Sequence, residues 1–246
     1  MKAFLLAAGK GTRLKPYTDN HPKCLIPIFG KPLLKIWLDN FEKHGIDEVL
    51  INTHHHADQV EHFIDGQRPA THMKLHTVYE PNLLGSAGTL WQNRDFISGD
   101  SDFVIAYADN LTNLNLGKMI DFHIKIRSMG GVLTMGLIKA PDPTVCGIVT
   151  LDDRRRVIKF VEKPSRPESD LANGGIYIAA AELFNEFERL PVTRGRLLDL
   201  GYDLLPRLAG RMYGFRITDY LADIGTPQSY RTALMQWEKL KDHGLK

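Results

Sequence analysis

Two glycines and two basic residues near the start of the chain have the spacing of an anion-binding loop. Gly9 and Gly11 follow an apolar run, Arg13 comes next, and Lys23 lies further along. Backbone N–H groups of a glycine-rich turn can point at a phosphate, and no side chain blocks its approach. A guanidinium binds phosphate in bidentate fashion, and an ammonium adds a second charge. These residues predict a loop that grips a triphosphate, although G-x-G alone is also typical of an ordinary turn.

Two aspartates and a Glu-Lys pair are the acidic candidates for chemistry. Asp109 ends an apolar run, and ligands of open α/β sheets bind beyond such strand ends. Asp223 precedes a turn glycine and a helix start, and Glu162 with Lys163 ends a predicted strand before Pro164. Asp109 could instead be a turn cap, while local sequence alone favours a plain turn aspartate at Asp223 and a solvated strand end at the Glu-Lys pair.

Two further clusters do not predict sites. His54 to His56 are expected on an extended segment, where neighbouring side chains point to opposite faces and cannot converge on one metal ion. Arg154 to Arg156 lie at a predicted hairpin turn and are expected to be solvated.

The elements that must position these residues alternate between strands and helices. The apolar patterns predict strands over 2–8, 48–53, 73–80, 102–109 and 130–138, and helices over 32–45, 85–96 and 116–128. Such alternation predicts a mostly parallel sheet covered on both faces.

The second half of the chain has a mixed pattern. A hairpin is expected over 146–164, strands over 173–180 and 212–218, and helices over 181–190, 199–210 and 226–244. Thr226 is the expected N-cap of the last helix and Pro227 its first residue. Since no linker or repeat divides the chain, we expect one domain over 1–246, whose sequence pattern changes at about residue 145.

Composition favours an ordinary globular protein. The chain has 246 residues, is 43% hydrophobic and has a net charge of only +2, which gives no basis for nucleic-acid or membrane binding. Cys24 and Cys146 suggest neither a disulfide framework nor a zinc site, so we expect a cytoplasmic protein. No signal peptide or membrane-spanning apolar run is expected.

The stretch LLAAGKGTRLKPYTDNHPKCLIP resembles the G-x-G-T-R-x(n)-P-K-x-L motif of the sugar-1-phosphate nucleotidyltransferases, the pyrophosphorylases that make NDP-sugars. GSAGTL, YADN, FVEKP, NGGIYI and YLADIGTP follow in the order of that family. The chain looks most similar to the short bacterial type, such as the mannose-1-phosphate guanylyltransferases. The resemblance implies an α/β fold with a Rossmann-like mixed, mostly parallel sheet flanked by helices, the nucleotide-diphospho-sugar transferase fold, and we expect no C-terminal β-helix.

The resemblance also implies an activity, a site and two functional halves of the one domain, a nucleotide-binding half to about 145 and a sugar-phosphate-binding half from about 146. An NTP and a sugar 1-phosphate would give an NDP-sugar and pyrophosphate, with Mg²⁺ as cofactor held by Asp109 and Asp223. The implied catalytic residues are Arg13, Lys23, Asp109, Lys163 and Asp223. The implied nucleotide-binding residues are Leu6, Ala7, Ala8, Gly9, Gly11, Thr12, Arg13, Lys23, Ser86, Ala87, Gly88 and Asp109. The implied sugar-phosphate-binding residues are Asn110, Gly147, Glu162, Lys163, Asn173 and Gly174. For the Ser86 to Gly88 segment, close helix–strand packing is an equally weighted alternative.

Several alternatives stay open. GSAG resembles a guanylyltransferase motif and favours GTP with mannose 1-phosphate, while UTP or dTTP with glucose 1-phosphate or N-acetylmuramate 1-phosphate remains the alternative. A catalytically inactive nucleotide-sensing subunit would share the fold, and a homodimer, common in the family, is one open oligomeric state. An oxidoreductase is disfavoured, because Leu14 replaces the third glycine of the dinucleotide motif.

Overall fold

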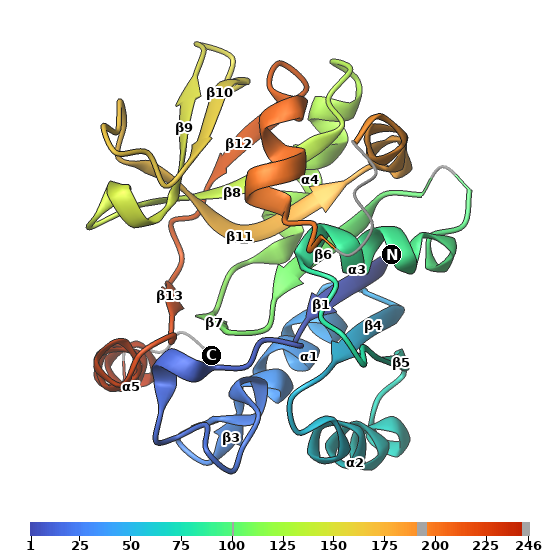
Figure 1. Cartoon of the computed structure of the whole chain (residues 1–246), viewed down its shortest axis with the longest axis vertical. Coiled ribbons are helices and arrows are strands. Elements are labelled where there is room, and N and C mark those ends of the chain that lie inside the picture. The colour runs from blue at the N-terminus through green and yellow to red at the C-terminus, as the bar shows by residue number, and fades with distance from the viewer. Residues whose placement is uncertain (100, 191–195, 243–246) are drawn as a thin grey trace.

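The computed structural model describes residues 1–99, 101–190 and 196–242 (Figure 1). A nine-stranded sheet has the order β10-β9-β11-β6-β1-β4-β5, with β8 beside β11 and β12 beside β8. Two-stranded sheets are formed by β2 with β3 and by β7 with β13. The sheet is mixed and flanked by helices, as predicted from the sequence.

Four parallel strands form the half of the sheet that comes from the first part of the chain. They are β1 (Lys2–Leu6), β4 (Glu48–Thr53), β5 (Lys74–Tyr79) and β6 (Phe103–Tyr107). β1 lies between β4 and β6, with Leu5 opposite Ile51 and Ala106. Because the strands are parallel, their carboxyl ends meet at one edge of the sheet, where side chains from distant parts of the sequence come together.

The antiparallel pairings lie in the second half. Its strands are β8 (Leu133–Lys139), β9 (Gly147–Leu151), β10 (Val157–Glu162), β11 (Leu171–Ala179) and β12 (Met212–Arg216). β9 and β10 form the predicted hairpin, and β11 pairs antiparallel with both β6 and β8. The short strands are β2 (Pro27–Ile28), β3 (Lys31–Pro32), β7 (Asn110–Thr112) and β13 (Leu221–Asp223). Through β11, the sheet continues from one half of the chain into the other.

Alternate residues of the central strands enter two cores on opposite faces of the sheet. Leu5 belongs to the core that contains Trp37 and Phe41, whereas Phe4 belongs to the core that contains Phe103. Every one of these side chains is buried. Since burying a large apolar side chain contributes roughly 1.5–3 kcal/mol, these strands need apolar residues on both faces, which is why they read as continuous apolar runs.

The helices are α1 (Leu33–Lys43), α2 (Ala57–Gln67), α3 (Ser86–Gln92), α4 (Leu116–Arg127) and α5 (Pro227–Asp242). The predictions for α1 and α4 are confirmed, whereas α3 ends earlier than predicted. The α-helix predictions over 181–190 and 199–210 were wrong in type. Ala181–Arg189 is a 3₁₀-helix, and Leu200–Leu204 is a π-helix followed by the 3₁₀ turn Leu205–Leu208. Pro206 has no N–H to continue an α-helical ladder there.

The extended segment expected at His54 to His56 was wrong. His56 has a left-handed backbone (φ 51°) and caps α2, a helix that was not predicted from the sequence. The rings of His55 and His56 lie 4.1 Å apart, and His54 Nδ1 lies 2.8 Å from the Glu80 carbonyl oxygen. Among the described residues, no group of three or more His, Cys, Asp and Glu side chains could hold a metal ion.

The last helix returns to the first half of the molecule. Thr226 Oγ1 accepts a hydrogen bond from Ser229 N (3.1 Å), which confirms the predicted N-cap, and Pro227 is the first helical residue. The Tyr230 hydroxyl donates to the Pro27 carbonyl (2.6 Å), so α5 lies beside the N-terminal loop in Figure 1. The predicted end of this helix, His243 and Gly244, lies outside the described residues.

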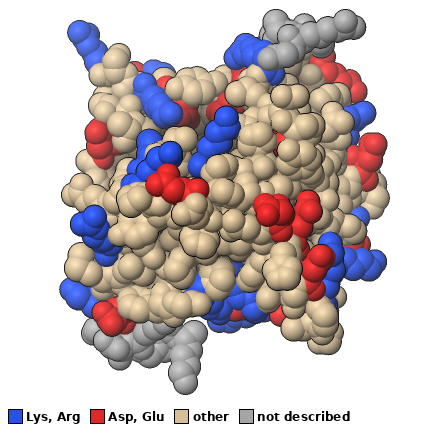
Figure 2. Space-filling model, turned by 60° about the horizontal axis from the view of Figure 1, so that its bottom comes forward, with Lys and Arg blue, Asp and Glu red and all other residues tan. Residues whose placement is uncertain are grey.

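The surface carries charges of both signs. Figure 2 shows basic and acidic side chains scattered among one another on one face. Within the three described ranges, no helix has the length and apolarity needed to span a membrane.

Candidate functional site

Asp109 lies where three cavities meet. The first, the strand-end cavity (≈ 300 Å³), lies beyond the carboxyl ends of the parallel strands. The second, the hairpin cavity (≈ 310 Å³), lies beside β9 and β10, and the third, the loop cavity (≈ 250 Å³), lies over the glycine loop. Asp109 lines all three. Ligands in these cavities would therefore meet at one carboxylate.

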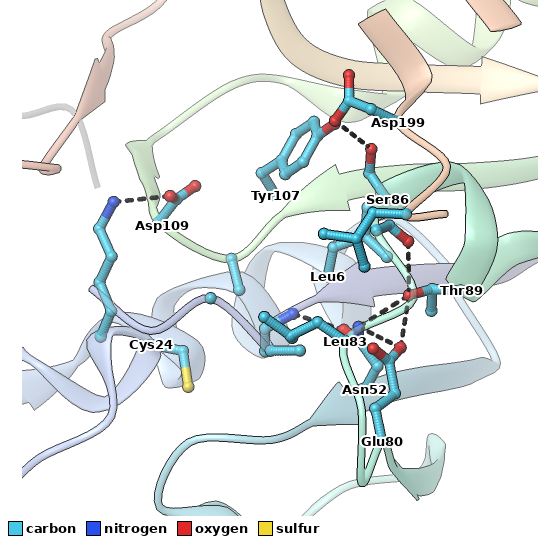
Figure 3. Close-up of a pocket in the computed structure, with 17 residues that line it drawn as sticks. Leu6, Cys24, Asn52, Glu80, Leu83, Ser86, Thr89, Tyr107, Asp109 and Asp199 are labelled. Atoms are coloured by element: carbon cyan, nitrogen blue, oxygen red, sulfur yellow. Dashed lines mark hydrogen bonds and ion pairs between the residues drawn. The ribbon is translucent and has the colours of Figure 1, made fainter. Parts of the chain in front are cut away.

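The strand-end cavity takes its lining from the ends of all four parallel strands (Figure 3). Leu6 ends β1 and residues 7–9 follow it, while Tyr107 ends β6 and residues 108–109 follow it. Asn52 lies at the end of β4, and Glu80 follows β5. Burial raises the pKa of the Cys24 thiol, which also lines this cavity, to about 12, so the thiol stays protonated. The remaining wall comes from the start of α3 and the segment around Asp199.

A buried hydrogen-bond network fixes the floor of this cavity. Glu80, only 2% exposed, accepts hydrogen bonds at Oε1 from Asn52 Nδ2 (2.9 Å) and Thr89 Oγ1 (2.5 Å), and at Oε2 from Leu84 N (3.1 Å). Asn52 Oδ1 accepts from Ala7 N (2.7 Å). The network thereby holds the backbone after β1 against β4, β5 and α3. Glu80 was not predicted from the sequence, although its place after a parallel strand resembles that of Asp109.

The loop cavity is built on a glycine that no other residue could replace easily. Gly11 has φ +63°, and a Cβ there would lie 2.8 Å from Thr18 Cγ2. Thr18 Oγ1 donates to the Gly11 carbonyl (2.8 Å), which fixes the turn. Thr12 and Arg13 follow in a 3₁₀ turn and line the cavity. Arg13 is exposed and has no hydrogen bond or ion pair with any described residue, which leaves its guanidinium open to an anion.

Lys23 joins the two predicted metal ligands. Its ammonium lies 2.6 Å from Asp109 Oδ2 and 3.2 Å from Asp223 Oδ1, and the residue is only 7% exposed. The structure thus brings together three residues that are up to 200 positions apart in the chain. Both carboxylates remain partly exposed, and an all-oxygen donor pair suits Mg²⁺, which proteins often hold through one or two carboxylates plus substrate phosphates.

Glu162 and Lys163 lie at the end of β10 in the hairpin cavity. Lys163 has φ +46°, a left-handed conformation that costs a side-chain-bearing residue on the order of 1 kcal/mol. Burial raises the pKa of the Glu162 carboxyl. A Cβ at Gly147 or Gly201 would lie 2.6 or 2.4 Å from Glu162 Oε2, so these two glycines make room for the carboxylate.

Asn110, Asn173 and Gly174 also line the hairpin cavity. The Asn110 amide donates to the Gly174 carbonyl (3.0 Å). The Asn173 amide donates to the Tyr177 hydroxyl (2.6 Å) and accepts from Gly175 N (3.0 Å). Both side chains therefore shape the cavity wall through contacts within the protein.

The residues of the Ser86 to Gly88 segment, for which base selection and close packing were both expected, differ in their surroundings. Ser86 lines the strand-end cavity, whereas Ala87 and Gly88 line none of the three cavities. Ala87 N and Gly88 N donate to the Leu198 carbonyl at 3.0 and 3.1 Å. At the start of α3, these two residues therefore contact the segment before the π-helix, which is not a strand.

All the other predicted site residues line at least one of the three cavities. The lining residues that were not predicted from the sequence include Asn52, Glu80, Thr89, Tyr107, Asp199, Gly201 and Tyr202. Asp199, Gly201 and Tyr202 carry no local motif, and only the tertiary fold brings them to the site.

Comparisons with known proteins match almost the whole chain. The family model described as "Nucleotidyl transferase" matches residues 2–239. A UTP–glucose-1-phosphate uridylyltransferase of Synechocystis sp. is 34% identical over 95% of this chain. A mannose-1-phosphate guanylyltransferase of Mycobacterium tuberculosis is 31% identical over 93% of it. The chain spans 62% of the length of each of these relatives. A structure of UDP-glucose pyrophosphorylase with UDP-glucose shares the fold, with a TM-score of 0.81, 20% identity and coverage of 97% of this chain and 98% of the other.

Proposed function

The chain belongs to the nucleotidyl transferase family, and from this premise we propose that it transfers a nucleoside monophosphate from an NTP to a sugar 1-phosphate. The observation that carries the proposal is the meeting of three cavities at Asp109. One cavity suits a base and ribose, one a triphosphate, and one a sugar phosphate. Their meeting point is where the α-phosphorus and the attacking phosphate would have to lie.

The nucleotide takes the strand-end and loop cavities. The backbone after β1, held by Asn52, lies against the base, and Gly11 with Thr12 cradles the phosphates. Arg13, with an open guanidinium, binds the β- and γ-phosphates and stabilises the leaving pyrophosphate. Lys23 lies next to Asp109, in reach of the α-phosphate.

The sugar 1-phosphate takes the hairpin cavity. Lys163 binds its phosphate, and Glu162 accepts hydrogen bonds from the sugar hydroxyls. Glu162 suits this role because no described residue donates a hydrogen bond to its carboxylate. The small residues Gly147 and Gly174 leave space for the sugar ring.

Asp109 and Asp223 would hold Mg²⁺ with phosphate oxygens completing its coordination. The ion supplies neutralisation of charge where two anionic phosphates approach. Lys23, already between the carboxylates, contributes a second cation at the same place.

The residues of this chain act by positioning and by charge. A phosphate monoester has a second pKa of about 6, so the attacking sugar phosphate is mostly dianionic at neutral pH and needs no general base. One of its oxygens forms a bond to the α-phosphorus, the bond to the bridging oxygen breaks, and pyrophosphate leaves with that electron pair. Arg13 and Lys23 stabilise the charge that develops, which is the main contribution in such reactions.

GTP with mannose 1-phosphate is the proposed substrate pair. The GSAG motif over residues 85–88, which resembles a guanylyltransferase motif, supports this pair. UTP or dTTP with glucose 1-phosphate is the second candidate, favoured by the uridylyltransferase relative. We propose a cytoplasmic location, where these metabolites occur.

Pyrophosphate release with Mg²⁺ tests the proposal across the five common NTPs and a panel of sugar 1-phosphates. Release that requires one particular pair supports nucleotidyl transfer and identifies both substrates. NTP binding without release for any pair would instead support a nucleotide-sensing protein. Absence of both binding and release would contradict the proposal.

A further inference from the structure

The strand-end and hairpin cavities share a wall. Tyr107, Asp109 and Asp199 line both cavities. Asp109 comes from the end of β6, but Asp199 comes from the second half of the chain, next to the π-helix. Figure 3 shows Asp199 reaching Ser86 beside the Tyr107 ring. The segment from Leu198 to Tyr202, which we call the wall segment, therefore contacts both proposed substrate cavities.

One end of the wall segment is fastened to the start of α3. The Leu198 carbonyl accepts hydrogen bonds from Ala87 N and Gly88 N, and Leu198 N donates to the Leu84 carbonyl (3.0 Å). At Gly85, which has φ +81°, a Cβ would lie 2.3 Å from the Leu198 carbonyl oxygen. This approach is closer than any side chain allows, so the backbone of the wall segment lies directly on the loop before α3.

Ser86 and Asp199 complete the attachment through side chains. The Ser86 hydroxyl donates to Asp199 Oδ2 (3.0 Å) and accepts from Leu200 N (2.8 Å). Asp199 Oδ1 accepts from Gly201 N (2.8 Å) and Tyr202 N (3.2 Å), which caps the π-helix. Asp199 thus connects a residue of the strand-end cavity to the backbone of two residues of the hairpin cavity.

The other end of the wall segment contacts the proposed sugar-phosphate residues. A Cβ at Gly201 would lie 2.4 Å from Glu162 Oε2, and the Lys163 ammonium lies 5.8 Å from the centre of the Tyr202 ring. Gly201 and Tyr202 are the residues whose N–H groups Asp199 holds. A shift of Asp199 would therefore displace the contacts of both Glu162 and Lys163.

We propose that Ser86 and Asp199 are positioning residues that couple the two substrate cavities, an inference that rests on the proposed function. Ser86 lines the strand-end cavity, yet its hydroxyl sets the place of Glu162 and Lys163 through Asp199. Loss of this hydroxyl then weakens the use of the sugar 1-phosphate more than the use of the NTP. A residue that only helps to select the base would show the opposite pattern.

Steady-state kinetics with the substrate pair found in the grid tests this coupling. Ser86→Ala should raise KM for the sugar 1-phosphate about tenfold, within the usual range for coupled sites, and change KM for the NTP much less. Asp199→Asn, which keeps the Oδ1 acceptor of the cap, should act in the same direction. Ser86→Thr, which keeps a hydroxyl, should restore most of the sugar KM. Ser128→Ala is the matched control, since Ser128 is exposed and donates only to the Lys125 carbonyl (2.7 Å).

A double-mutant cycle separates coupling from independent damage. If Ser86 and Asp199 act through one hydrogen bond, the double variant should raise the sugar KM no more than the stronger single variant. Additive effects, or a Ser86→Ala variant that changes only the KM for the NTP, would overturn the inference and leave the proposed function intact. Wild-type protein that shows no turnover with any pair would instead contradict the proposed function, and the inference with it.

Discussion

At the scale of the residue, Lys23 connects the parts of the site. It is almost fully buried, yet its ammonium contacts two carboxylates from distant parts of the chain. A buried ammonium is tolerated only with such partners, because an unpaired charge loses its hydration. The same cation can stabilise a bound phosphate, so one side chain both holds Asp109 and Asp223 together and prepares the site for an anion.

The two aspartates should be needed for turnover. Asp109→Asn and Asp223→Asn each remove a proposed metal ligand and one partner of Lys23, and each should lower kcat by roughly 10²–10³-fold, a usual loss for one electrostatic contact in an active site. Asp65→Asn is the control, since Asp65 is an exposed partner of Arg68. Near-normal kcat in either active-site variant would refute the role of that residue.

The raised pKa of the Glu162 carboxyl should make the stability of the protein depend on pH. Burial raises the pKa of its carboxyl; Lys163 opposes this shift and Asp199 adds to it. A carboxyl with a raised pKa in the folded state stabilises the fold while protonated, and this contribution is lost as pH rises through that pKa. Glu162→Gln, which stays neutral, should therefore raise Tm over wild type at about pH 8, with the gain disappearing near about pH 4.

Exposed Glu168, paired with Lys159 (2.7 Å), provides the control for that experiment. Glu168→Gln should not raise Tm at the higher pH. A Glu162→Gln variant that is less stable than wild type at the higher pH would show that the ionised carboxylate contributes to folding, which would contradict the destabilising effect of its burial.

At the scale of the element, the two glycines of the loop after β1 have different roles, because one affects NTP binding alone and the other affects stability as well. A Cβ at Gly9 would meet no atom within 4 Å, whereas Gly11 has φ +63° and a close contact with Thr18. Gly9→Ala should leave the free energy of unfolding nearly unchanged but weaken NTP binding, because the new methyl group enters the space shared by the strand-end and loop cavities. Gly11→Ala should cost about 2 kcal/mol of stability as well.

Denaturant unfolding and NTP titration of both variants check this pair. If Gly9→Ala and Gly11→Ala lost the same free energy of unfolding, the claim that only Gly11 needs a left-handed backbone would be contradicted. Unchanged NTP affinity of a folded Gly9→Ala variant would show that the phosphates lie elsewhere.

The elements differ in how far the sequence could predict them. The parallel strands are continuous apolar runs because both faces are buried, and they were found within a few residues. α2 was missed because it begins after three histidines and buries only Val60 and Ile64, too few for a clear helical pattern. Glu80 could have been found by the same strand-end argument as Asp109, whereas Asp199 depends on long-range contacts that no local pattern records.

At the scale of the whole molecule, the two halves of the chain form one continuous sheet, and both contribute residues to each core. β11, from the second half, pairs with β6 and β8 of the first half, and α5 returns to pack Tyr230 on the first-half core. The proposed site lies across this junction, which explains why Lys23 can meet Asp223. Each of the two cores contains residues of both halves.

The chain should accordingly unfold in a single transition. Trp37 lies in the core of the first half, so in a Trp91→Phe, Trp237→Phe variant the tryptophan fluorescence reports on that core, while far-UV circular dichroism reports on the whole sheet. The two signals should give coincident denaturant curves. Two separated transitions would show that the halves are independent units and would contradict the continuous sheet as the unit of stability.

The central claim is that the α-phosphate of an NTP passes to a sugar 1-phosphate at the meeting point of the three cavities. Its most direct test follows a radiolabelled α-phosphate of the NTP found in the substrate grid, in the presence of Mg²⁺ and the matching sugar 1-phosphate. We predict that the label appears in an NDP-sugar in amounts equal to the pyrophosphate released, and that Asp109→Asn slows the formation of both products by roughly 10²–10³-fold. Label that appears only as free nucleoside mono- or diphosphate would show hydrolysis and contradict transfer to the sugar phosphate.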